Sequence, residues 1–113
     1  MHELSVTSGL VDMVNKEAVT NNAIKVVSVK LKVGKLSCLV PEIVKDYFQL
    51  LSEGTASEGA ELIIEKFPGR IHCNDCDEDF EIEDFRIICP KCKGRNADLI
   101  EGRESYIDSI VVE

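Results

Sequence analysis

Two short cysteine motifs constrain the fold of this chain more than any other feature. Residues 73–76 read Cys-Asn-Asp-Cys and residues 89–92 read Cys-Pro-Lys-Cys, with twelve residues between the two pairs. Each pair fits a tight turn, built from turn-forming residues, that points both sulfurs to the same side. Two such turns facing each other place four thiolates at the corners of a tetrahedron, which is the geometry of a structural zinc ion. The spacing therefore predicts a zinc ribbon whose ligands are Cys73, Cys76, Cys89 and Cys92.

The alternatives to a zinc site are two disulfides or four unrelated buried cysteines. Disulfides belong to oxidising compartments, but the opening residues, Met1–Ser5, lack the positive and apolar regions of a signal peptide. We therefore expect a cytoplasmic location, where Cys-x-x-Cys pairs bind metal more often than they form disulfides. Four sulfur ligands would close the site to water and substrate, so the zinc would be structural rather than hydrolytic. The fifth cysteine, Cys38, stands alone and is interpreted as an ordinary small apolar residue.

Charge and composition exclude several classes of function. The chain of 113 residues carries a formal net charge of −8, and residues 68–113 hold six Lys or Arg against twelve Asp or Glu. Seven acids and no base lie within Asp75–Asp84, a region that would repel a phosphate backbone, so we expect no nucleic-acid partner. No apolar run approaches the roughly 20 residues needed to cross a bilayer, so we expect no membrane span. The chain has two histidines, and neither stands near a plausible Ser or Cys nucleophile in the sequence, so we expect no enzymatic activity.

Apolar periodicity predicts two helices outside the cysteine region. Residues 3–20 place apolar side chains at helical spacing, and Asn21 and Asn22 supply a stop. A second helix is expected to begin at Pro41, because a missing N–H is tolerated at the first helical position, and to stop at Gly54. The buried stripes should contain Leu4, Leu10, Val11, Met13, Val14 and Ala18 in the first helix, and Val44, Phe48 and Leu51 in the second.

Three further segments, residues 24–33, 61–67 and 105–113, are predicted to be strands. The last segment would have no partner as an isolated strand, so we expect all three to form one sheet. In the first strand the intervening Ser and Lys residues should face water, and the side chains expected to face the core are Val27, Val29, Leu31 and Val33.

The overall prediction is an α+β fold with two domains. Residues 1–67 and 105–113 should form a small three-stranded sheet with two helices, and the zinc ribbon of residues 68–104 should be inserted before the last strand. Zinc is expected to be a folding requirement of its own module, because metal binding can contribute on the order of 10 kcal/mol there. Within the ribbon two hairpins are predicted, the first pairing residues 70–72 with 80–82 and the second pairing residues 85–89 with 97–100.

The first three residues carry a second metal-binding pattern. The α-amine of Met1, the next backbone nitrogen and the His2 imidazole can chelate one ion through three nearly coplanar nitrogens, and Glu3 can add an oxygen. Ni²⁺ and Cu²⁺ prefer such planar, nitrogen-rich ligation, whereas Zn²⁺ prefers a tetrahedron. Binding requires that Met1 is retained and that its amine, with a reference pKa of about 7.7–8.0, loses a proton. The alternative is that His2 has no role and that Glu3 is an acid in the first turn of its own helix.

Taken together, the opening Met-His-Glu-Leu-Ser, the α/β body, the two cysteine pairs and the short apolar tail closely resemble the HypA family of hydrogenase nickel-incorporation accessory proteins. The resemblance implies a small cytosolic nickel metallochaperone with a structural Zn²⁺ on the cysteine pairs and Ni²⁺ at the N-terminus. It implies His2 as the principal nickel ligand, with the Met1 amine, the His2 amide and Glu3 as co-ligands. It also implies two partners, a GTPase of the HypB type and the large subunit of nickel–iron hydrogenase, and in some organisms a role in urease maturation.

One departure from the family pattern concerns the zinc module. Some members carry a histidine directly after each cysteine pair, whereas here Asp77 follows the first pair and Lys93 follows the second. His72 precedes Cys73 and is interpreted as an ordinary strand residue, so a histidine-dependent zinc switch is not expected in the same form.

Two other classes of function stay open from the residues alone. A zinc ribbon can be a nucleic-acid or protein-interaction module, although the acidic charge disfavours nucleic acid. The second cysteine pair, followed by Lys93 and Gly94, also resembles a knuckle of rubredoxin, which would make the chain an iron-containing electron carrier.

Overall fold

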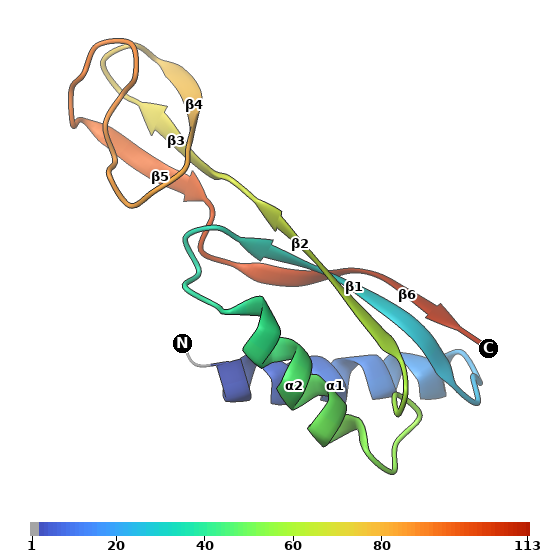
Figure 1. The fold of residues 1–113 in the computed structure, drawn as a ribbon. Coiled ribbons are helices and arrows are strands. Elements are labelled where there is room, and N and C mark those ends of the chain that lie inside the picture. Colours follow the sequence, from blue (N-terminus) through green and yellow to red (C-terminus); the bar gives the residue numbers. More distant parts are fainter. Residues whose placement is uncertain (1–2) are drawn as a thin grey trace. The chain divides into compact units, whose positions relative to one another are not determined.

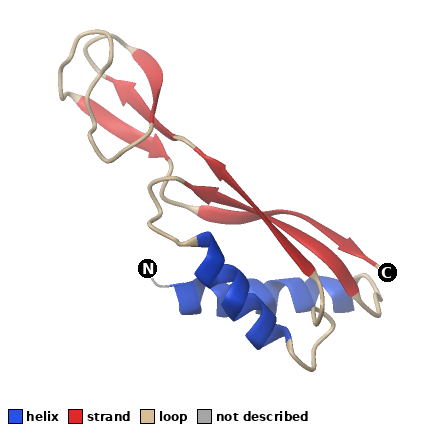
Figure 2. Cartoon of the chain, in the orientation of Figure 1, coloured by secondary structure: helices blue, strands red, loops and turns tan. Residues whose placement is uncertain are grey.

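The computed structural model describes residues 3–113, which form two helices and two three-stranded sheets (Figure 1, Figure 2). The α+β fold class predicted from the sequence is confirmed. One sheet has the strand order β2-β1-β6 and the other has the order β4-β3-β5. The elements in chain order are α1 (Glu3–Thr20), β1 (Val26–Gly34), α2 (Pro41–Ser52), β2 (Glu61–Phe67), β3 (Gly69–Cys73), β4 (Glu78–Ile82), β5 (Ala97–Glu101) and β6 (Ser105–Val112).

Contacts divide the chain into two compact units. The first unit comprises the residues up to Lys32, together with Leu39–Glu65 and Tyr106–Glu113. The second unit comprises Val33–Cys38 and Lys66–Ser105, and so contains both cysteine pairs. Residues 33–38 lie far from the cysteine pairs in the sequence, yet their contacts belong to the second unit. No helix among residues 3–113 is both long enough and apolar enough to span a membrane.

The core of the first unit lies between the two helices and one face of their sheet (Figure 1). Phe48 of α2 and Val14 of α1 are almost completely buried. From β1, Val29 and Leu31 reach the same core, because alternate residues of a strand share one face. Removal of this apolar surface from water is the main stabilising contribution to the unit. The other buried residues of the helices are Thr7, Leu10, Val11 and Ala18 in α1, and Val44 and Ser52 in α2.

Some residues expected in the core are exposed. Leu4 and Met13 of α1 are 49% and 58% exposed, so the buried stripe of this helix is narrower than predicted. In β1, Val27 is 42% exposed and Val26 is buried instead. The strand begins at Val26, later than expected, and Ile24 lies in a bend before it and is 90% exposed.

The second sheet is centred on β3, and its pairing corrects one predicted hairpin. The pairing of β3 with β4 is antiparallel, with Cys73 opposite Glu78, and agrees with the first predicted hairpin. However, β5 pairs with β3, with Ala97 opposite Cys73, and not with residues 85–89, which form no strand. Residues 85–89 make other contacts instead. Ile87 packs against the cluster of Leu36, Ile71 and Ile82, and the N–H of Cys89 donates to the carbonyl of Gly94.

A close backbone approach ties residues 33–38 into the second unit. The N–H of Leu36 donates to the carbonyl of Gly102 at 2.8 Å, and the N–H of Gly34 donates to the carbonyl of Glu104 at 2.9 Å. A Cβ atom at Gly34 would lie 2.0 Å from the carbonyl oxygen of Gly102. Gly102 has φ +131°, a backbone conformation that favours glycine. Both positions therefore require glycine.

Candidate metal centre

The structure brings the four cysteines of the two pairs together in the second unit. Their sulfur atoms all lie within 4.8 Å of one another. The Cys73–Cys92 and Cys76–Cys89 sulfur pairs are each 3.8 Å apart. Four sulfurs about 2.3 Å from one tetrahedral ion would be about 3.8 Å apart. The cluster therefore fits a structural zinc site, and an ion held there would stabilise the module without offering a position to a substrate.

The two cysteine turns have the same local geometry. In each turn the residue after the second cysteine has a positive φ, +53° at Asp77 and +63° at Lys93. Its N–H returns to the carbonyl of the first cysteine, at 2.8 Å for Asp77 and 2.9 Å for Lys93. This left-handed residue closes each turn and directs both sulfurs inward. Neither residue is glycine, and only Asp77 is of a type that adopts a positive φ more often than most, so the sequence does not mark the matching position at Lys93.

Backbone N–H groups point at the sulfur atoms. The N–H of Cys76 lies 3.5 Å from the sulfur of Cys73, and the N–H of Cys92 lies 3.4 Å from the sulfur of Cys89. Burial raises the pKa of Cys89, but N–H groups of Cys92 and Lys91 outweigh burial and lower that pKa to about 7. Burial, together with the neighbouring thiols, raises the pKa of Cys76 to about 12. Metal binding would therefore release protons from this cluster.

A network of amides and carboxylates joins the first cysteine turn to the segment after the second. The Asn74 side chain donates to the side chains of Asn96 and Asp98, each at 3.2 Å. Asn96 donates in return to Asp75 at 3.1 Å, and the backbone N–H of Asn74 donates to the Asn96 carbonyl at 2.9 Å. The two turns are thus connected by protein contacts as well as by any shared ion. The sequence pointed to Asn74 and Asp75 only as turn residues.

His72 is directed at carboxylates and not at the sulfur cluster. It lies in β3, where its Nδ1 is 2.7 Å from Asp79 and its Nε2 is 3.3 Å from Asp77. The hydrogen bond to Asp79 and the charges of both carboxylates raise the pKa of His72 above its usual value. The interpretation of His72 as a strand residue is confirmed.

Of the predicted nickel ligands, Met1 and His2 lie outside the described residues. Glu3 opens α1, and its Oε2 accepts the N–H of Val40 at 3.0 Å. Val40 is the N-cap residue of α2, so the carboxylate of Glu3 stands at the start of the second helix. An acid is favourable there, because the N-terminal end of a helix carries partial positive charge. The sequence analysis placed Glu3 either among the nickel ligands or at the dipole of its own helix, and did not predict its contact with α2.

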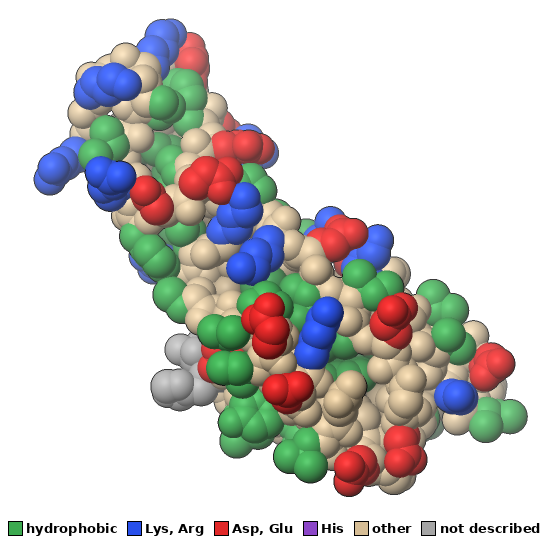
Figure 3. Space-filling model, viewed as in Figure 1, with side chains coloured by type: hydrophobic (Ala, Val, Ile, Leu, Met, Phe, Trp, Pro, Cys, Tyr) green, Lys and Arg blue, Asp and Glu red, His purple; other side chains and the backbone are tan. Residues whose placement is uncertain are grey.

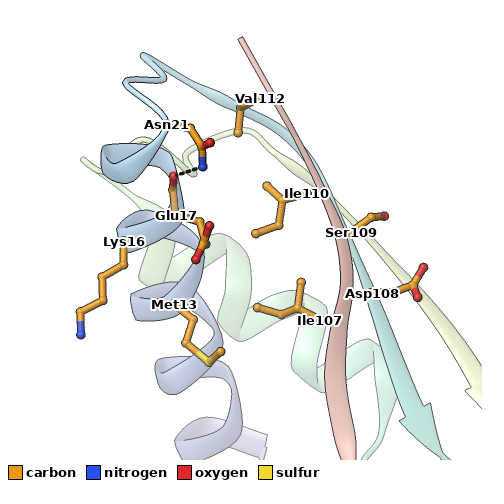
Figure 4. Close-up of a pocket in the computed structure, with 9 residues that line it drawn as sticks. All are labelled: Met13, Lys16, Glu17, Asn21, Ile107, Asp108, Ser109, Ile110 and Val112. Atoms are coloured by element: carbon orange, nitrogen blue, oxygen red, sulfur yellow. Dashed lines mark hydrogen bonds between the residues drawn. The ribbon is translucent and has the colours of Figure 1, made fainter.

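A groove of about 620 Å³ lies between α1 and β6 in the first unit (Figure 4). Ile107 and Ile110 point from β6 toward α1, whereas Asp108 and Ser109 point away. Among the residues that the structure describes, none of the predicted metal ligands lines the groove. Its lining residues are Met13, Lys16, Glu17, Asn21, Ile107, Asp108, Ser109, Ile110 and Val112.

Comparisons with known proteins agree with the resemblance seen in the sequence. A family model described as hydrogenase/urease nickel incorporation, metallochaperone, hypA, matches residues 1–112. The hydrogenase maturation factor HypA of Caldanaerobacter subterraneus subsp. tengcongensis is 44% identical over 115 residues, covering 100% of both chains. The protein of the same name from Aquifex aeolicus is 34% identical over 113 residues, covering 100% of this chain and 98% of its own.

Solved structures share the fold. The solution structure of the nickel metallochaperone HypA from Helicobacter pylori has a TM-score of 0.73 and 25% sequence identity, covering 99% of this chain and 97% of that one. A second solution structure of a HypA protein has a TM-score of 0.78 and 26% identity, covering 100% of this chain and 97% of that one. With the family model spanning almost every residue, this chain belongs to the HypA family of nickel metallochaperones for hydrogenase and urease nickel incorporation.

Proposed function

We propose that this chain binds Ni²⁺ at its N-terminus and delivers it during the maturation of nickel–iron hydrogenase. The observation that carries the proposal is the family match, which runs from residue 1 to residue 112 and therefore includes the opening tripeptide as well as the cysteine pairs. The proposed nickel ligands are the His2 imidazole, the Met1 amine and the His2 amide nitrogen, with Glu3 as a further ligand. Such a nitrogen-rich set suits Ni²⁺.

The chemistry of these ligands favours reversible binding. A terminal amine binds metal only after losing its proton, so a fall in local pH or contact with a partner loosens the ion. Glu3 supports the site in a second way, because its bond to Val40 fixes the start of α1 against α2. A chelate built on a fixed helix start loses less chain entropy on binding than one on an unanchored end.

The remaining parts of the proposal rest on the four-cysteine cluster and on the family to which the chain belongs. Cys73, Cys76, Cys89 and Cys92 hold a structural zinc ion, and the chain catalyses no reaction of its own. It acts in the cytoplasm with a GTPase of the HypB type and with the hydrogenase large subunit, and it binds neither nucleic acid nor membrane. Urease is a second possible recipient, because the family description names both enzymes.

The test is a gene replacement in the source organism with His2→Ala. We expect nickel–iron hydrogenase activity to be lost and to be partly restored by excess nickel in the medium, since the defect is one of supply. Cys38→Ala is the control, because this exposed cysteine lies outside the four-cysteine cluster. Normal hydrogenase and urease activities in the His2→Ala strain would refute the proposal.

A further inference from the structure

The charges of the zinc module are segregated along the chain. Residues 75–84 carry seven acids and no base, whereas residues 85–97 carry four bases and no acid. The net charge of residues 68–113 is negative, so the sum alone does not reveal the basic stretch. The four bases surround the second cysteine pair and are called the basic face below: Arg86, Lys91, Lys93 and Arg95.

All four bases of the basic face are exposed. Lys91 lies 3.0 Å from Glu78, and Arg86 lies 3.5 Å from Asp84. Lys93 donates to the carbonyl of Pro90, and within residues 3–113 neither Lys93 nor Arg95 forms an ion pair. Figure 3 shows Lys and Arg side chains gathered at the end of the second unit, at the upper left of the view.

A small cleft opens on the basic face. It has a volume of about 220 Å³ and is lined by Arg86, Ile87, Ile88 and Arg95. Pockets for drug-sized ligands measure about 300–1,000 Å³, so this cleft suits a single side chain rather than a free metabolite. Two guanidinium groups beside an apolar lining suit a segment in which carboxylates flank an apolar side chain, because guanidinium groups bind carboxylates through paired hydrogen bonds.

We propose that the basic face is the docking surface for an acidic, extended segment of a partner protein. An apolar side chain of that segment enters the cleft of Ile87 and Ile88, and its neighbouring carboxylates pair with Arg95 and Lys93. A nucleic acid fits less well, because its continuous negative charge would meet the acids of residues 75–84. The basic face shares no residue with the proposed N-terminal nickel site, so it can be tested on protein without nickel.

A purely structural role for these bases makes a different prediction. Four thiolates around one Zn²⁺ carry a net charge of −2, and nearby bases could serve only to balance that charge. In that case loss of Lys93 and Arg95 would weaken zinc binding. Zinc content therefore separates the two roles.

The experiment measures fluorescence anisotropy of a short labelled peptide of alternating Glu and Leu, titrated with zinc-loaded full-length protein. Lys93→Glu/Arg95→Glu should weaken binding by about tenfold or more, because like charges then face each other. The matched control is Lys25→Glu/Lys45→Glu, which changes the net charge equally at exposed lysines of the first unit and should leave binding unchanged. Binding by the wild type should also weaken with added salt.

Three results would overturn the proposal. The first is an absence of peptide binding by the wild type, and the second is equal weakening by the control variant. The third is loss of zinc by the milder variant Lys93→Gln/Arg95→Gln, which would assign the bases to the metal site. If the first result is accompanied by binding of a labelled oligonucleotide, the face is assigned to nucleic acid instead.

Discussion

At the scale of single residues, one carboxylate connects the two helices of the first unit. Glu3 lies at the start of α1, and its Oε2 accepts the N–H of Val40 just before α2. No side chain of α2 provides a cap at this position. The contact therefore satisfies the N–H of the N-cap residue, as the Glu of a capping box does, and holds the beginnings of both helices together.

Loss of this carboxylate should destabilise the first unit. Glu3→Ala is expected to lower the free energy of unfolding by about 1 kcal/mol, the usual cost of losing a helix cap. Urea unfolding followed by helical circular dichroism measures the change. Glu17→Ala, at an exposed position of the same helix, is the control. Equal stability of Glu3→Ala and the wild type would show that the bond to Val40 contributes nothing.

The ionisation of His72 gives a second prediction at this scale. Its pKa is raised above 6.5, first by the hydrogen bond to Asp79. A raised folded-state pKa stabilises the protein below the unfolded value, and this contribution is lost as pH rises through the folded value. An NMR titration of the His72 ring in zinc-loaded protein should therefore give a midpoint above 6.5. Asp79→Asn should lower that midpoint, and an unchanged midpoint would contradict the assigned cause.

At the scale of elements, the contact between the end of β1 and the turn between β5 and β6 depends on two glycines. A Cβ at Gly34 would meet the backbone of Gly102, and backbone atoms cannot rotate away as a side chain can. This contact fixes residues 33–38 in the second unit.

Substitution at this contact should be costly. Gly34→Ala is expected to lower the free energy of unfolding by about 1–3 kcal/mol through overpacking. The control is Gly9→Ala in α1, where the added methyl meets nothing within 4 Å and helix propensity should raise stability by about 0.5–1 kcal/mol. Urea unfolding of both variants measures the difference, and a neutral Gly34→Ala would contradict the close approach.

The main elements could be predicted from the sequence because their apolar residues are periodic. The helices, the three strands of the first sheet and the β3–β4 hairpin follow this pattern. The partner of β5 could not be predicted, because short strands with similar patterns do not specify their neighbour. In the structure the N–H of Cys89 bonds to the carbonyl of Gly94 and not to a strand, and β5 pairs with β3. The hydrogen bond between Glu3 and Val40 could not be predicted either, because the carboxylate of Glu3 accepts a backbone N–H that almost any residue at position 40 would supply.

At the scale of the whole molecule, the two units have cores of different strength. The first unit buries apolar residues from two helices and a sheet, whereas the second has a core cluster of only Leu36, Ile71 and Ile82 with partly buried neighbours. The burial of so few apolar side chains cannot by itself offset the conformational entropy that the module loses on folding. Metal binding at the four-cysteine site would supply the additional folding free energy.

Metal removal should therefore unfold the second unit before the first. After treatment with a strong chelator under reducing conditions, amide NMR signals of residues 69–101 should lose their dispersion. Signals from α1 and α2 should persist, and added Zn²⁺ should restore the rest. Loss of the helical signals together with those of the ribbon would show that the first unit cannot fold alone.

The most direct test of the central claim is a calorimetric titration of Ni²⁺ into zinc-loaded, tag-free protein beside His2→Ala. The native N-terminus is essential, because any added residue removes the amine from the chelate. The account predicts about one Ni²⁺ per chain for the wild type and loss of that binding in His2→Ala. Equal nickel binding by both proteins, or none by either, would contradict it.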